Sequence, residues 1–266
     1  MGIPTPSQVA MEPFVKFTAQ SPAKEKIYRT AQYTCTLLHH LAGTAGLSGD
    51  VAALLKQLET HLSMGRKMLR LGQSADCVVA ARRTVHLSDP VLRLCLTVAQ
   101  LNRGLYLACD NLLWAGKLGL IAKLDSDKWS KRAFRFYLLV LLMGLARDAY
   151  EVALLVDREA RARGKRGGRS GGAVAEWANG EEYSQGSGDP ARLGTRVRGY
   201  CALTCHVMRT NHAVLLDLVK NLCDVVIPLD RLGLRQSSPG VVGLCGVISS
   251  VLGILQITHP WLKLKP

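Results

Sequence analysis

The side chains best suited to bind a ligand lie between residues 51 and 72, where cations and leucines alternate around one predicted helix. The segment has one acid, Glu59, and four cations: Lys56, Arg66, Lys67 and Arg70. Leucines recur beside them at three- and four-residue spacing: Leu54, Leu55, Leu58, Leu62 and Leu69. Ammonium and guanidinium groups bind phosphate, and such a helix can lie in the plane of an acidic membrane with its apolar side among acyl chains. The same pattern is also typical of a solvated helix that packs on its neighbours.

A second feature is the absence of charge over residues 236–262. This length is enough for one tilted transmembrane helix, since about 20 apolar residues span the hydrocarbon core. Trp261 has the position of an interfacial aromatic residue, and Lys263 and Lys265 follow it as anchors. We therefore predict a transmembrane helix over 236–262 and a basic tail over 263–266.

Small residues recur four apart inside this segment, as Gly246 with Ser250 and Ser249 with Gly253. Such spacing lets two helix backbones approach closely within lipid. We predict that these four residues form a self-association face between copies of the chain. The alternatives are a buried core helix, or glycines that serve only bends.

Residues 91–123 are apolar but contain Arg103, Asp110 and Lys117, which are seven residues apart and share one helix face. A charge at the centre of a membrane helix costs about 2.5 to 3.5 kcal/mol, so independent insertion of this segment is marginal. It is predicted to associate with the membrane, either against partner helices or shallowly in the interface. The polar stripe also suggests an alternative function, a helical bundle that forms a pore for small metabolites.

The composition narrows the class of protein. Lys and Arg outnumber Asp and Glu by 34 to 20 while 48% of the residues are hydrophobic, which favours an acidic phospholipid membrane as partner. The basic residues are spread over several segments without aromatic interleaving, which argues against nucleic acid. No Gly-rich phosphate loop or nucleophile elbow occurs, so neither an enzyme nor a cofactor is predicted. Cys201, Cys205 and His206 lack a second pair of ligands, so no metal site is predicted.

The sequence as a whole predicts an all-α fold, a membrane-associated helical bundle with amphipathic helices and a carboxy-terminal transmembrane helix. Its regions in order are a disordered leader (1–13), a helical membrane-associated region (14–163), a Gly-rich flexible linker (164–190), a basic helical segment (191–235), the transmembrane helix and the basic tail. Helices are expected over 22–41, 51–72 and 127–163. The run 136–146 is apolar all round but too short to cross a bilayer, so it is predicted to be buried core or a re-entrant element.

Six stretches, in order along the chain, resemble the peroxin-eleven family of peroxisomal membrane proteins, specifically its animal alpha/beta branch. They read AQYTCTLL, LETHLSMGRKMLRLG, HLSDPVLRLCLTVAQLNRGLYLACDNLLWAGK, RDAYE, LLDLVKNLCDVVIPLDRLGL and PGVVGLCGVISSVLGIL with PWLKLKP. Together they cover nearly the whole chain from Met11 onward. The departures are residues 1–10 and the linker, and the DNLLWAGK stretch with the Gly-rich linker favours the beta side of the branch.

The resemblance implies an integral peroxisomal membrane protein, its termini facing the cytosol, that elongates the organelle before division. The amphipathic helix of that family inserts into acidic membrane, and it corresponds here to residues 54–71. The resemblance also implies self-association into a homo-oligomer and recruitment of the dynamin-like fission GTPase and its tail-anchored adaptor. The implied targeting partner is a cytosolic import receptor for peroxisomal membrane proteins, which would bind the segment around 209–260. Cytosolic termini require a second crossing, for which 91–123 is the candidate.

Overall fold

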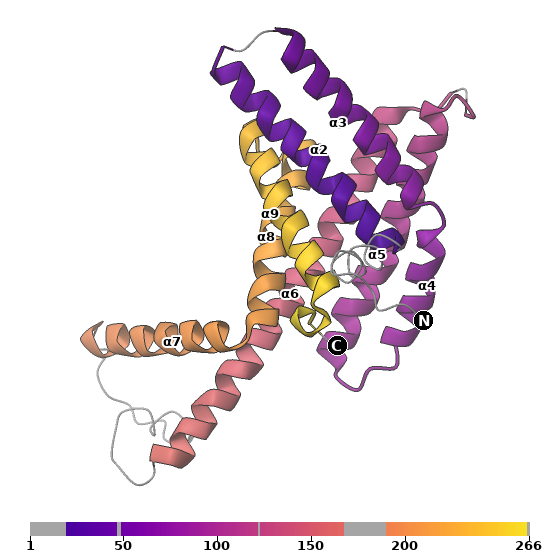
Figure 1. Ribbon diagram of the computed structural model, residues 1–266. Coiled ribbons are helices and arrows are strands. Elements are labelled where there is room, and N and C mark those ends of the chain that lie inside the picture. Colours follow the sequence, from indigo (N-terminus) through magenta and orange to yellow (C-terminus); the bar gives the residue numbers. More distant parts are fainter. Residues whose placement is uncertain (1–19, 47–48, 122, 168–189, 265–266) are drawn as a thin grey trace, which may run out of the picture.

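The computed structural model describes residues 20–46, 49–121, 123–167 and 190–264, which are almost entirely helical (Figure 1). The helices in chain order are α2 (Ser21–Thr44), α3 (Gly49–Leu69), α4 (Gln73–Thr84), α5 (Pro90–Lys117), α6 (Ser126–Gly167), α7 (Pro190–Thr210), α8 (His212–Arg231), α9 (Pro239–Thr258) and the short 3-10 helix η2 (Pro260–Leu262). No strand occurs in these ranges, so the all-α prediction is confirmed. The predicted leader over 1–13 lies outside the described residues, as does the linker apart from its two ends, which belong to α6 and α7.

The helix boundaries differ from the predicted ones in three places. The basic segment 191–235 divides at Asn211 into α7 and α8, and α8 continues through Pro228 in its last turn. Gly72 adopts a left-handed conformation (φ 80°), which turns the chain into α4, a helix that the sequence pattern did not predict. The apolar run 136–146 is part of the continuous helix α6 and not a re-entrant element.

Antiparallel helix pairs build the bundle. α2 packs on α3, α5 on α6 and α8 on α9, while α2 also lies along α9 and α6 along α8 (Figure 1). α4 packs against α5 on the outside of this arrangement. The carboxy-terminal part of α6 extends beyond the bundle, where α7 meets it (Figure 1).

The start of α5 shows how the sequence fixes a helix end and a helix pair together. One carboxylate oxygen of Asp89 accepts hydrogen bonds from the backbone N–H groups of Val91 (2.8 Å) and Leu92 (3.2 Å), and Pro90 occupies the first helical position. The other oxygen accepts the hydroxyl of Tyr150 in α6 at 2.9 Å. The Leu92 N–H, with the Tyr150 hydroxyl, lowers the pKa of Asp89 below its usual value. This N-cap therefore also ties α5 to α6.

Polar side chains occupy much of the interior of the described bundle. The buried charged and amide residues are Glu25, Arg29, Gln32, Glu59, Arg66, Asp110, Asp148, Asp217, Asn221 and Asp224. Large apolar side chains lie on the surface of the same helices, for example Leu38 of α2, Leu101 of α5, Leu142 of α6 and Leu222 of α8. Extensive apolar surface over a polar, paired interior is typical of a protein that lies in lipid.

Arg29 links three helices at the centre of the bundle. Its guanidinium forms an ion pair with Asp224 of α8 and donates a hydrogen bond to the Ser249 hydroxyl of α9 at 3.1 Å. Ser249 in turn donates to Asp224. The side chains of Arg29 and Asp224 are only 8% and 6% exposed, so water does not screen the pair.

A second buried cluster joins α6 to α8. Arg147 pairs with its neighbour Asp148 and with Asp217 of α8. The amide of Asn221 donates to the other oxygen of Asp148 at 2.6 Å. Because Asp148 is fully buried, these partners are what allow a carboxyl group at this depth.

Small residues let α9 lie close against α2. A Cβ atom at Gly243 would lie 2.9 Å from the backbone nitrogen of Leu37, and one at Gly246 would overlap the ring of Tyr33. The backbones can therefore approach only because these positions carry no side chain. The opposite side of α9 is apolar and exposed, through Val241, Leu244, Ile248, Val251 and Leu255.

Within the described ranges, α9 is the one helix long and apolar enough to cross a membrane, judged by length and composition, with a mean hydropathy of 2.1. Its bounds, Pro239–Thr258, fall inside the predicted span 236–262, and η2 forms the remainder. Ser238 caps its start by accepting a hydrogen bond from the Val241 N–H at 3.3 Å.

Replacing Arg29 with Met leaves the buried Asp224 without a counter-charge, and we expect this to lower the free energy of unfolding by about 3 to 5 kcal/mol. The double variant Arg29→Met/Asp224→Leu removes both charges and should recover most of the loss. Denaturant unfolding of the detergent-solubilised protein, followed by circular dichroism, measures both. The exposed, unpaired Arg82 supplies the control, since Arg82→Met should change little. A double variant no more stable than Arg29→Met would contradict the pairing.

Replacing Gly246 with Leu forces the Tyr33 ring away and should lower the free energy of unfolding by about 1 to 3 kcal/mol. Hydrogen exchange of the α2 amides around residues 33–37 should speed up, while Val251→Leu on the exposed side of α9 should leave it unchanged. If Gly246→Leu instead separates oligomers and leaves α2 exchange untouched, the small residues form an intermolecular face.

Candidate lipid-binding surface

α3 presents charge inward and leucine outward. Leu54 and Leu58 are 65% and 46% exposed, whereas Glu59 and Arg66 are buried. At about 100° per residue the two leucines lie about 80° to 140° around the helix from the two charges, so they occupy a different side. The exposed side of α3 therefore carries apolar side chains, together with exposed polar residues such as Gln57 and His61.

Val51 and Met68 are also exposed on this side. We call the four residues Val51, Leu54, Leu58 and Met68 the outer face of α3. The remaining leucines of the predicted stripe, Leu55, Leu62 and Leu69, are half-buried between the outer face and the charged side. The single stripe of the sequence is thus divided between the surface and the helix interface.

Arg66 pairs with α2. Its Nε and Nη2 donate to Glu25 Oε1 at 3.0 and 2.9 Å, and its Nη1 donates to Gln32 Oε1 at 2.7 Å. The guanidinium also lies over the Tyr33 ring, 6.0 Å from its centroid. Three hydrogen bonds and one ring contact of a buried arginine thus fix α3 on α2.

Lys67 and Arg70 pair with α5. Their ammonium and guanidinium nitrogens lie 3.0 and 2.7 Å from the two carboxylate oxygens of Asp110. Arg70 also donates to the Tyr106 hydroxyl at 2.8 Å. Asp110 is buried, so it depends on these two cations as its counter-charges.

These contacts give three of the four predicted cations partners within the chain. Arg66, Lys67 and Arg70 face acids of the same chain, because the docking of α3 against α2 and α5 turns its basic side inward, and their binding to lipid stays a prediction. Lys56 remains at the surface, with 62% of its side chain exposed beside Glu59 at 3.0 Å. Cation spacing alone could not reveal acids that lie far away in the sequence.

The polar stripe of α5 does not assemble around a cavity. Asp110 is turned to α3, while Arg103 and Lys117 are exposed. None of the three lines the groove between α5 and α6 or the smaller cavity between α6 and α7. One of the three residues whose spacing suggested a pore, Asp110, is therefore part of the contact between α5 and α3.

The predicted self-association face is occupied within the chain. Gly246 contacts Tyr33, Gly253 faces Lys26, and Ser249 and Ser250 are fully buried. Gly246, Ser249 and Gly253 contact α2 and Ser250 is buried against the backbone of α9, so this side of α9 is not open to a second copy in the described arrangement. The predicted anchors follow the carboxy-terminal end of α9. Trp261 is 71% exposed, and its ring is tilted against that of His259. Lys263 is exposed, and Lys265 lies outside the described residues.

Sequence reasoning missed the buried pairs of α8. Asp217, Asn221 and Asp224 are three and four residues apart in an otherwise apolar helix, which marks one polar face. That face could have been recognised as the inner side of a helix in lipid. Its partners, Arg29 and Arg147, could not have been identified from spacing.

The comparisons with known proteins identify a family. The family described as peroxisomal biogenesis factor 11 (PEX11) matches residues 11–258. Peroxisomal membrane protein 11B of Homo sapiens is 50% identical over 260 residues, which cover 96% of this chain and all of the relative. Peroxisomal membrane protein 11A of Homo sapiens is 36% identical over 255 residues, covering 96% and 99% of the two chains. Peroxisomal membrane protein PMP30A of Candida boidinii is 24% identical over 250 residues, covering 91% and 92%.

No solved structure matches the chain significantly. The family match spans most of the sequence, and identity to the 11B relative exceeds identity to the 11A relative, which agrees with the beta-like character predicted from the sequence. The chain belongs to the peroxisomal biogenesis factor 11 family of peroxisomal membrane proteins and has a role in peroxisome biogenesis.

Proposed function

We propose that the chain elongates the peroxisomal membrane ahead of organelle division, with the outer face of α3 acting as a wedge in one leaflet. The observation that carries the proposal is the orientation of α3, whose Arg66 and Lys67 are paired inside the bundle while its Leu54 and Leu58 are exposed. Apolar side chains held in the interfacial plane expand one leaflet relative to the other, and that asymmetry favours curvature.

The buried ion pairs give the wedge a rigid mount. Arg66 fixes α3 to α2, and Lys67 with Arg70 fixes it to α5, so the outer face cannot retreat when it enters lipid. α2 is in turn packed along α9, the candidate span. The wedge is therefore connected through α2 to the segment that holds the protein in the membrane.

The attraction to acidic lipid is assigned to exposed cations. Each Lys or Arg near an anionic surface contributes about 1 kcal/mol. Lys56 stands beside the outer face of α3, and the chain as a whole has a net charge of +14. In this mechanism the role of Arg66, Lys67 and Arg70 is to hold α3 against α2 and α5.

Topology and partners complete the proposal. Cytosolic termini require a second crossing besides α9, and α5 is the candidate because its exposed side carries Val91, Leu94, Leu101 and Leu105. We further propose that copies associate through the exposed apolar side of α9. The import receptor for peroxisomal membrane proteins would bind the basic and apolar segment around 209–260, and the dynamin-like GTPase and its tail-anchored adaptor would join the assembled copies.

The double variant Leu54→Asn/Leu58→Asn removes the centre of the outer face of α3. In acidic, dye-loaded vesicles that contain the full-length protein, we expect tubules with the native chain and far fewer with this variant, without dye leakage in either case. Gln57→Asn/His61→Asn is the matched control, because it changes two exposed polar residues of α3 at the same spacing. Leakage from vesicles that stay round would refute the wedge and restore the pore.

The variant Arg66→Glu distinguishes a structural cation from a headgroup ligand. Placing a carboxylate against Glu25 should lower the free energy of unfolding by about 3 to 5 kcal/mol, and the exchanged pair Arg66→Glu/Glu25→Arg should recover part of it. Thermal unfolding and vesicle binding are measured on the same preparations. A stably folded Arg66→Glu protein that binds acidic vesicles poorly would show that Arg66 binds lipid directly.

A further inference from the structure

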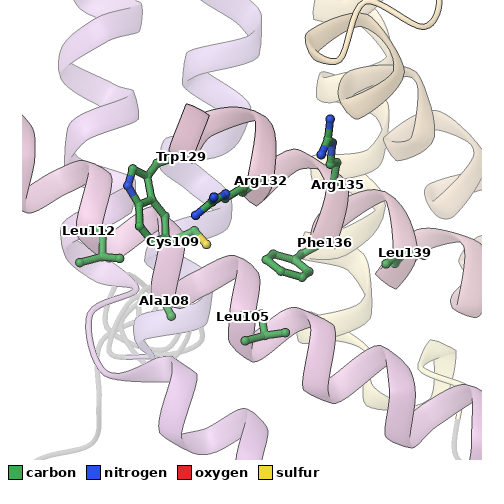
Figure 2. A pocket seen from close by; sticks show the side chains of 9 residues that line it. All are labelled: Leu105, Ala108, Cys109, Leu112, Trp129, Arg132, Arg135, Phe136 and Leu139. Carbon is green, nitrogen blue, oxygen red and sulfur yellow. The ribbon is translucent and has the colours of Figure 1, made fainter. Parts of the chain in front are cut away.

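An open groove runs between α5 and α6, on the far side of α5 from the Asp110 pairs. It has a volume of about 650 Å³ and apolar walls, formed chiefly by Leu105 and Leu112 of α5 and by Phe136 and Leu139 of α6 (Figure 2). Ligand sites in proteins commonly have volumes of about 300 to 1,000 Å³. The groove is thus large enough to hold a substantial part of an amphiphile.

Two arginines of α6 line one side of this groove. Arg132 reaches over Cys109 beside Trp129, and Arg135 follows one helical turn later (Figure 2). Both are exposed, and in the part of the chain that the structure describes neither forms an ion pair with a carboxylate. The recorded contact of Arg132 is the Trp129 ring, 5.1 Å from its guanidinium carbon.

The pairing of the neighbouring charges favours an anion in the groove. Lys128 is paired with Asp125 at 2.9 Å, and Asp110 is turned away to Lys67 and Arg70. The arginines that point into the bundle, such as Arg29 and Arg66, all have carboxylate partners. Arg132 instead presents its guanidinium to the groove, and Arg135 lines the rim with its guanidinium directed away from Phe136 (Figure 2). Guanidinium groups bind phosphate in a fork geometry.

The groove is continuous with the apolar surface of the bundle. Leu101 and Leu105 on α5, with Leu139 and Leu142 on α6, are all exposed. A ligand that enters from this surface comes from hydrocarbon and not from water. Trp129 at the arginine end matches the preference of tryptophan for the headgroup level of a bilayer. The occupant therefore has an anionic head and an acyl body.

We propose that the groove between α5 and α6 binds one anionic glycerophospholipid of the membrane. Its phosphate lies between Arg132 and Arg135, and an acyl chain lies along Leu105, Phe136 and Leu139. This inference needs the chain to lie in a membrane but does not depend on tubulation, because the groove and the outer face of α3 are separate surfaces.

The test uses Trp129 as a reporter in full-length protein that carries Trp114→Phe, Trp177→Phe and Trp261→Phe. The protein is reconstituted into phosphatidylcholine vesicles with a small fraction of spin-labelled phosphatidic acid or, separately, spin-labelled phosphatidylcholine. We expect stronger quenching of Trp129 by the labelled phosphatidic acid. The preference should disappear in Arg132→Gln/Arg135→Gln and in Ala108→Phe, which fills the groove.

Two controls make the result specific. Lys131→Gln removes an exposed cation of the same helix turn that does not line the groove, and Leu94→Phe enlarges an exposed apolar residue elsewhere on α5. Both should keep the preference for phosphatidic acid. Circular dichroism and the thermal midpoint of each variant establish that it is folded.

Three outcomes would overturn the proposal. Equal quenching by both labelled lipids in the native groove would mean that no anionic headgroup is selected. Loss of the preference in Lys131→Gln to the same extent as in the arginine variant would mean diffuse surface charge. A preference for spin-labelled stearic acid, with none for phosphatidic acid, would assign the groove to a free fatty acid.

Loss of tubulation in Leu54→Asn/Leu58→Asn with Trp129 quenching intact would leave this inference standing, so the two proposals fail separately.

Discussion

The buried pair between Arg29 and Asp224 is the contact on which the rest of the described bundle depends. It joins α2 to α8, and through Ser249 it includes α9. Helices surrounded by lipid gain little from burying more apolar surface, because acyl chains are as apolar as leucine. Paired charges and close backbone packing must therefore determine which helix faces which. Arg29 supplies the first, and the glycines of α9 against Tyr33 and Leu37 supply the second.

The same principle explains the inverted amphipathicity of α3. A basic amphipathic helix on a soluble protein would show its cations to water and bury its leucines. In this chain, acids on α2 and α5 bind the cations, and the leucines of the outer face of α3 point outward. The energetic reason is that Glu25 and Asp110 are buried and need counter-charges, whereas exposed leucines are tolerated where the surroundings are apolar.

The bundle thus separates two classes of cation. Those turned inward hold helices together, and those turned outward, including Lys56, Arg132 and Arg135, are available to anionic lipid. A large positive net charge in the sequence counts both classes alike. In the mechanism proposed above only the outward class contributes to membrane attraction, which would then depend on fewer residues than the composition suggests.

The sequence by itself determined the helical class, the positions of most helices, the apolar carboxy-terminal segment and the family. These follow from local properties, since hydrophobic periodicity, caps such as Asp89 and charge-free length are all encoded within a few turns. It did not determine which charges are paired. Glu25 and Arg66 are 41 residues apart, and Arg29 and Asp224 are 195 residues apart, so no local pattern connects them. The tertiary structure alone decided that the small residues of α9 meet α2, that Asp110 pairs with cations of α3, and that Arg132 and Arg135 lie beside an apolar groove with no carboxylate partner among the described residues. Each of these depends on which helices pack together.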